Sequence, residues 1–129
     1  MKTLDQKNIT GVVALLVHAA KIDEQYSDSE KILIKEFINS YLNNDKTDDI
    51  LNDAEELEKN SNQLLNFTNI IKKETNDFKS DIIKHLWKII ISDKSIDQYE
   101  SNLMRRICGL IYFPDKECAE IKMKIMNNK

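Results

Sequence analysis

The chain has 129 residues, the size of one ordinary domain, and 41% of them are hydrophobic, so it can bury a core without disulfides or a structural metal. Its 19 basic and 22 acidic residues give a net charge of −3 with no basic block, which argues against the positive face that nucleic-acid binding needs. Only two glycines and one proline are present. Both residue types break helices, so their scarcity favours an all-α protein.

The first half of the chain is expected to form four helices, over about Ile9–Ile22, Asp28–Leu42, Asp48–Lys59 and Gln63–Lys73. In the first, apolar residues recur at the spacing of one helix face: Ile9, Val12, Val13, Leu16, Val17 and Ala20. We expect Leu57 in the third helix and Leu65 in the fourth to face the core. The outer face of the third is acidic: Asp48, Asp49, Asp53, Glu55, Glu56 and Glu58. This face is interpreted either as solvated or as a docking surface for a basic partner.

The second half predicts three helices, over about Asp77–Ser92, Gln98–Leu110 and from Pro114 onward, which makes about seven in all. We expect Asn76 to cap the first of these, and Phe113-Pro114 to end the second. The helix over Asp77–Ser92 is apolar on more than half of its circumference, so it is predicted to be central. Its apolar residues are Phe78, Ile82, Ile83, Leu86, Trp87, Ile89 and Ile90.

Two features bear on the location of the protein. Cys108 and Cys118 each fall on an apolar stripe, and we expect reduced, buried thiols rather than a disulfide framework. The apolar run Gly11–Ala20 resembles a secretory signal, but Asp5 and His18 oppose that interpretation. No run approaches the eighteen apolar residues typical of a membrane span. We therefore expect a cytoplasmic protein.

Residues 12–38 align with residues 82–108 without a gap. Four aligned positions are identical, and many others are apolar in both copies. The identical pairs are Leu16/Leu86, Asp23/Asp93, Glu30/Glu100 and Leu33/Leu103. Each copy reads as a helix, a turn and a second helix. The repeat therefore predicts two helix hairpins, related by a pseudo-twofold axis, that form the core.

The turn of each copy carries an acidic octet, Asp23–Glu30 or Asp93–Glu100, with the pattern Asp-x-x-x-[Ser/Asp]-x-x-Glu. The last four residues of each octet form a capping box, Ser27 with Glu30 and Asp97 with Glu100, which is sufficient to explain them. Asp23 and Asp93 lie outside that motif. They are open to two interpretations, an Asx-turn that bonds backbone amides or a divalent-cation site.

The cation interpretation rests on the hard oxygen atoms that Ca²⁺ and Mg²⁺ prefer as ligands. The candidate ligands are Asp23, Asp93, Asp97, Glu30 and Glu100. The spacing is not that of an EF-hand, which uses a loop of about twelve residues with a glycine at the sixth. If the pseudo-twofold axis brings the two turns together, Asp23 and Asp93 are placed to share one ion.

The pattern Ala20-Lys-Ile-Asp23-Glu-Gln-Tyr-Ser27-Asp-Ser-Glu30, followed by Leu33, Ile34 and Phe37, resembles the TerB-like (tellurite-resistance TerB) family. The stretch from Leu86-Trp87 through Asp93, Asp97 and Glu100 to Leu103 and Ile107 is similar to the second half of that family. The resemblance covers about residues 9–121, and is closest to short stand-alone members of uncharacterised function. It predicts one TerB-like domain over residues 1–129.

The resemblance implies an all-helical fold with an internal repeat, an acidic metal-binding centre and a link to tellurite and stress responses. One departure affects the turns. Family members usually carry glycine after each aspartate, whereas this chain has Glu24 and Lys94. Glycine permits tight turns that other residues resist, so the loop and ligand geometry of the family does not carry over directly to this chain.

No nucleophile elbow, phosphate loop or dinucleotide motif is present, so we expect no enzyme and no certain cofactor. His18 and His85 lack the further ligands that zinc requires. Two functions follow. The first is a non-catalytic helical module that binds a divalent cation and serves in tellurite or stress response. The alternative is a protein-protein interaction scaffold without an ion. The sequence identifies neither the protein partner nor the oligomeric state.

Overall fold

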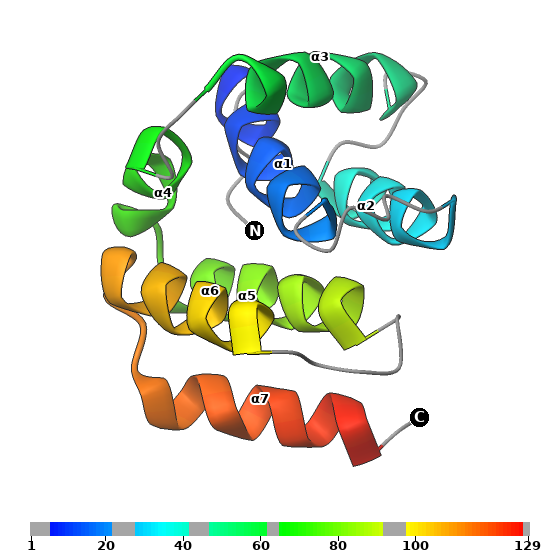
Figure 1. The fold of residues 1–129 in the computed structure, drawn as a ribbon. Helices are drawn as coiled ribbons and strands as arrows, with labels where there is room; N and C mark the ends of the chain where they lie inside the picture. Colours follow the sequence, from blue (N-terminus) through cyan, green and yellow to red (C-terminus); the bar gives the residue numbers. More distant parts are fainter. Residues whose placement is uncertain (1–5, 22–27, 42–46, 62–64, 92–97, 128–129) are drawn as a thin grey trace.

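The computed structural model describes residues 6–21, 28–41, 47–61, 65–91 and 98–127, and within these ranges the chain forms seven α-helices and no strand. The sequence-based prediction of an all-α fold is confirmed (Figure 1). The helices are α1 (Gln6–Ala20), α2 (Asp28–Tyr41), α3 (Thr47–Lys59), α4 (Leu65–Lys72), α5 (Asn76–Ile91), α6 (Gln98–Leu110) and α7 (Asp115–Asn127).

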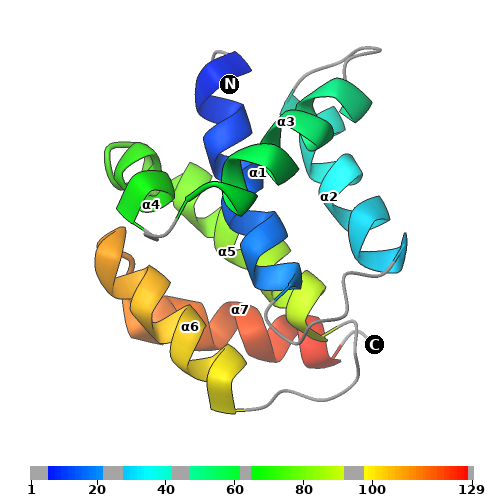
Figure 2. The ribbon, with the colours of Figure 1, turned by 45° about the horizontal axis from the view of Figure 1, so that its top comes forward.

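The helices stack in layers. The helix α3 packs on α1 and α2, these two pack on α5, α6 lies beside α5, and α7 packs below both (Figure 1). The short α4 connects the two halves along one side, where it contacts α1 and α6. The turned view shows α1 and α5 passing through the middle of the molecule, with α2 and α4 on opposite sides and α6 and α7 below (Figure 2).

The helix α1 is enclosed more completely than its predicted stripe indicates. The expected inward residues are buried, but so are Ala14, Leu15 and Ala19 on the remaining circumference. The reason is that α1 contacts α2, α3, α4 and α5, so neighbouring helices cover it on almost every side. A helix that is hydrophobic all round is typical of such a buried position.

The helix α5 is central, as predicted, because it contacts α1, α2, α6 and α7. Its buried residues include the whole predicted apolar set together with Lys79 and Ile91. Two other predictions of inward-facing residues are wrong. Leu57 is 42% exposed and Leu65 is 44% exposed, because each lies on the side of its helix that no other described helix covers.

The seventy-residue repeat is visible in the helix boundaries. The helices α1 and α5 begin at Gln6 and Asn76, and α2 and α6 begin at Asp28 and Gln98, so both pairs of starts are seventy residues apart. In addition, α3 packs on α1 as α7 packs on α5. Each repeat unit therefore extends to a third helix. The pseudo-twofold relation between the hairpins stays a prediction.

The start of α5 differs from the sequence-based prediction. Asn76 is the first helical residue rather than the cap. The cap is Thr75, whose hydroxyl oxygen accepts a hydrogen bond from the backbone N–H of Phe78 at 3.2 Å. This bond satisfies one of the amides that have no partner in the first turn of a helix.

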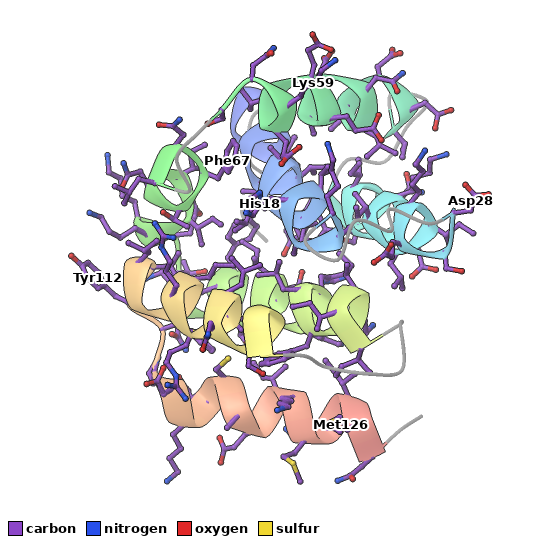
Figure 3. All side chains as sticks on the ribbon, viewed as in Figure 1. His18, Asp28, Lys59, Phe67, Tyr112 and Met126 are labelled. Carbon is purple, nitrogen blue, oxygen red and sulfur yellow. The ribbon has the colours of Figure 1, made fainter. Side chains whose placement is uncertain are left out.

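The end of α6 is set by backbone geometry that the sequence did not indicate. Tyr112 has a φ of 60°, and the N–H of Phe113 donates to the carbonyl of Cys108 at 2.8 Å. Together with the bond from Tyr112 N–H to Gly109, this pattern is a Schellman motif, which usually has glycine where Tyr112 stands. The tyrosine side chain is 72% exposed and extends into solvent below α4, where Lys72 lies 5.5 Å from its ring centre (Figure 3).

Both cysteines are free and buried, as predicted. Within the described ranges, no helix has both the length and the apolar character needed to cross a membrane.

Candidate functional site

Of the five predicted cation ligands, Glu30 is the one whose side chain the structure describes. Asp23, Asp93 and Asp97 lie outside the described residues, and Glu100 is placed by its backbone alone. Glu30 stands in the first turn of α2 and is only 1% exposed. A carboxylate is rarely so buried unless its oxygen atoms are satisfied, and Glu30 does have a polar or electrostatic partner.

The starts of α2 and α6 agree with the predicted capping boxes. Because α2 begins at Asp28 and α6 begins at Gln98, Glu30 and Glu100 each occupy the third helical position. That position is where the glutamate of a capping box stands. Among the described residues, no three His, Cys, Asp or Glu side chains gather closely enough to hold a metal ion. The cation site at the turns stays a prediction.

A second polar site lies between α2 and α5, in a hollow of about 590 Å³. At its centre the hydroxyl of Tyr41 donates a hydrogen bond to Asp81 Oδ2 at 2.6 Å. Burial raises the pKa of Tyr41 well above its usual range, and the hydrogen bond and negative charge of Asp81 raise it further. Tyr41 is therefore held as a neutral donor. The hollow is lined by Ser40, Tyr41, Glu74, Thr75, Asp77, Phe78, Asp81 and His85.

Aromatic rings form the floor of this hollow. Phe37 is fully buried, and its ring centre lies 5.0 Å from those of both Tyr41 and His85. Tyr41 also meets Phe78 edge to face, at 5.2 Å. The Nδ1 of His85 donates to the backbone carbonyl of Asp81 at 2.8 Å, which fixes the ring against the helix. We refer to this hollow, with the eight lining residues named above, as the α2–α5 hollow.

The chemistry of the α2–α5 hollow suits a cationic group. Its wall carries the carboxylates of Glu74, Asp77 and Asp81, and its floor is aromatic. Ammonium and guanidinium groups are attracted both by carboxylates and by aromatic faces. This site was not predicted from the sequence, since Tyr41 and Asp81 are forty residues apart and only the docking of α2 on α5 brings them together.

The acidic outer face predicted for α3 requires a correction at Glu58. The Glu58 side chain is 12% exposed and points toward the end of α1, not into solvent. Its Oε1 accepts a hydrogen bond from Lys21 at 2.9 Å, and its Oε2 lies 3.2 Å from His18 Nδ1. The physical reason is that α3 packs on α1, so the last turn of α3 meets the last turn of α1.

Comparison with known proteins identifies the family. The family model described as "Tellurite resistance protein TerB" matches residues 10–123. The chain belongs to the TerB family. The search of curated proteins and the search of solved structures found no match. The match covers both acidic octets, all of α2 to α6 and most of α1 and α7, so the resemblance predicted from the turns and the repeat is confirmed for the TerB family. The single domain over residues 1–129 stays a prediction.

In this TerB-family chain, the contact of Glu58 with α1 predicts a pH-dependent stability. Burial raises the pKa of Glu58, but the hydrogen bonds and positive charges of Lys21 and His18 outweigh burial and lower it overall. A carboxyl with a lowered folded pKa stabilises the protein above its unfolded pKa, about 4.3, and loses that contribution as the pH falls through the folded pKa. We expect Glu58→Gln to lower the free energy of unfolding by about 1–2 kcal/mol at pH 7.

The measurement is urea denaturation, followed by circular dichroism, at pH 7 and at several values from pH 5 to pH 3. The difference between wild type and Glu58→Gln is expected to be constant above about pH 5 and to shrink below about pH 4. Glu56→Gln is the matched control, because Glu56 is exposed on the same helix. An equal loss in both variants, or a difference that does not change with pH, would contradict the role of Glu58.

Proposed function

We propose that this TerB-family protein is a non-catalytic helical module that binds a divalent cation, Ca²⁺ or Mg²⁺, at its two acidic turns. Asp23 and Asp93 are the proposed central ligands, and Asp97, Glu30 and Glu100 are further ligands. The proposed role is in tellurite or stress response, in line with the description of the family. The proposed location is the cytoplasm, which the two free cysteines support.

The observation that carries the proposal is the burial of Glu30, the last residue of the first octet. If the pseudo-twofold axis brings the two turns together, their carboxylates would repel one another unless positive charge neutralises them. The donor set fits the cation, because carboxylate oxygens are the ligands that Ca²⁺ and Mg²⁺ prefer. A bound cation would supply two positive charges to the turns. The matched starts of α2 and α6 also support the proposal, since they give the two octets the same position relative to their helices.

The alternative is a protein-protein interaction scaffold, in which the acidic turns are only caps. The α2–α5 hollow favours this alternative, because its carboxylates and aromatic rings suit a lysine or arginine side chain of a basic partner. The alternative predicts no response to divalent cations. It also predicts that changes at Asp23 and Asp93 alter stability alone.

The test is a titration of the metal-free protein with Ca²⁺ and with Mg²⁺, followed by thermal unfolding and by the fluorescence of Trp87. At a hundredfold excess over Kd, a ligand that binds only the folded state adds about 2.7 kcal/mol to the stability. For a domain of this size, we expect the Tm to rise by roughly 5–10 °C. Trp87 is the only tryptophan, and its helix leads into the second octet, so it reports on that turn.

Asp23→Asn and Asp93→Asn are each expected to abolish the rise in Tm while the helical content is unchanged. Asp53→Asn is the control, because Asp53 is an exposed carboxylate on α3, far along the chain from both octets. An unchanged Tm in millimolar Ca²⁺ and Mg²⁺ would reject the cation site and leave the scaffold as the better function. A rise that persists in both Asp23→Asn and Asp93→Asn would reject these ligands.

A further inference from the structure

The α2–α5 hollow has the size and the lining of a small-molecule site. Its volume is about 590 Å³, and pockets that hold small organic ligands range from about 300 to 1,000 Å³. Such pockets combine apolar and aromatic walls with a few polar groups that orient the ligand. Three of the residues that line the hollow carry rings and three carry carboxylates, and none of the eight is a lysine or an arginine. The lining therefore selects a ligand that is both apolar and positively charged.

One carboxylate of the hollow is held in position by its neighbours. The hydroxyl of Tyr41 donates to Asp81 Oδ2 at 2.6 Å. The other oxygen, Oδ1, lies 3.6 Å from His85 Nδ1, which is too far for a hydrogen bond. His85 Nδ1 donates instead to the backbone carbonyl of Asp81. Asp81 is thus fixed through one oxygen atom and retains the other to accept a hydrogen bond from a ligand.

The carboxylates are spread along the start of α5 rather than gathered at one point. Asp77 and Asp81 are one helical turn apart, about 5–6 Å between their Cβ atoms, and Glu74 comes just before the helix. In the part of the chain that the structure describes, no three His, Cys, Asp or Glu side chains converge closely enough to hold a metal ion. A single metal ion therefore does not match the hollow, whereas a chain that carries several positive charges does.

The charge of the hollow also requires more than one positive charge. Each of its three carboxylates carries one negative charge at pH 7, and the start of α5 offsets only roughly half a charge through the helix dipole. One lysine or arginine side chain of a protein partner would leave most of this negative charge unbalanced. A ligand with two or three ammonium groups balances it, and ammonium groups are also attracted to aromatic faces.

We propose that the α2–α5 hollow binds a linear aliphatic polyamine, with its ammonium groups on the carboxylates and its methylene chain against the rings. This ligand differs from the basic protein partner of the scaffold function, because a free polyamine carries several charges along one flexible chain. The hollow is separate from the cation site proposed at the acidic turns and does not depend on it, since no residue of either octet is among the lining residues.

The test is isothermal titration calorimetry of the full-length protein with spermidine, putrescine and butylamine, which carry three, two and one positive charges. All titrations use the same low ionic strength, because salt screens exposed charges. We expect one spermidine per chain, and an affinity that falls by roughly three- to tenfold with each charge removed. No binding of spermidine, or equal affinities for the three amines, would overturn the polyamine site.

Asp77→Asn and Asp81→Asn are each expected to weaken spermidine binding by roughly three- to tenfold. Circular dichroism establishes that both variants fold, and the amide oxygen introduced by Asp81→Asn can still accept the Tyr41 hydroxyl. Asp115→Asn is the matched control, because Asp115 is an exposed aspartate in the first turn of α7, as Asp77 is in α5. An equal loss of affinity in Asp115→Asn and Asp77→Asn would overturn the site, since spermidine would then respond to net charge alone.

A peptide with one lysine between alanines, titrated in parallel, distinguishes the two sources of an ammonium group. Weaker binding of the peptide than of spermidine supports the polyamine. Binding of the peptide that equals or exceeds that of spermidine would overturn the polyamine and support the basic partner of the scaffold function. Asp23→Asn is expected to bind spermidine like the wild type, so the result at the hollow is independent of the Ca²⁺ and Mg²⁺ titrations. A loss of spermidine binding in that variant would place spermidine at the turns and overturn the hollow as its site.

Discussion

Replacing Leu15 with lysine is expected to unfold the protein at room temperature or to bring it close to unfolding. Leu15 is fully buried in α1. Truncating a buried leucine to alanine costs roughly 2–5 kcal/mol, and a lysine adds the cost of burying an ammonium group without a partner. The sum approaches the whole stability of an ordinary domain, about 5–15 kcal/mol. Circular dichroism in water, followed by urea denaturation of any folded fraction, measures the loss.

The control is Ile32→Lys, which makes the same kind of change in α2, at a side chain that is 57% exposed. It is expected to alter the free energy of unfolding by less than about 0.5 kcal/mol. The pair of variants also tests the arrangement of helices around α1. If α1 exposed the face that carries Leu15, Leu15→Lys would resemble Ile32→Lys. A loss below about 1 kcal/mol for Leu15→Lys would contradict the enclosure of α1.

The fold was predictable because helical periodicity is strong in this chain. The apolar spacing of α1 and α5 and the capping boxes before α2 and α6 gave helices whose boundaries agree with the structure to within a few residues. Periodicity identifies the side of a helix that faces a core, but not how many neighbours cover the helix. For that reason Leu15 was not expected to be buried, and Leu57 was expected to be buried although it is exposed.

The sites were less predictable than the fold, because they join residues that are distant in sequence. Tyr41 meets Asp81 and Glu58 meets His18, each across the contact between two helices. No local pattern marks these pairs, since each residue taken alone is typical of a core or a solvated face. The acidic octets carry the opposite kind of signal. Their motif is local and clear, but Asp23 and Asp93 lie outside the described residues, so their separation stays a prediction.

Truncating Phe37 to alanine is expected to lower the free energy of unfolding by about 3–5 kcal/mol. Phe37 is fully buried where α2 docks on α5, and its ring packs against Tyr41 and His85. The loss combines the transfer of a large side chain, a cavity and two ring–ring contacts. Because Phe37 supports Tyr41 and His85, two residues that line the α2–α5 hollow, the truncation is also expected to loosen that lining. Thermal unfolding should show a fall in Tm of roughly 10–20 °C.

Tyr41→Phe separates the packing of the ring cluster from its hydrogen bond. It keeps the ring and removes the hydroxyl that donates a hydrogen bond to Asp81. We therefore expect the free energy of unfolding to fall by about 1 kcal/mol at pH 7. The pKa of Tyr41 is raised on folding, so its stabilising contribution is complete below about pH 10, the unfolded pKa, and is lost as the pH rises further. The difference between wild type and Tyr41→Phe should therefore shrink above pH 10, whereas the loss in Phe37→Ala should persist. If Phe37→Ala cost no more than Tyr41→Phe at pH 7, the hydrogen bond rather than ring packing would hold α2 against α5.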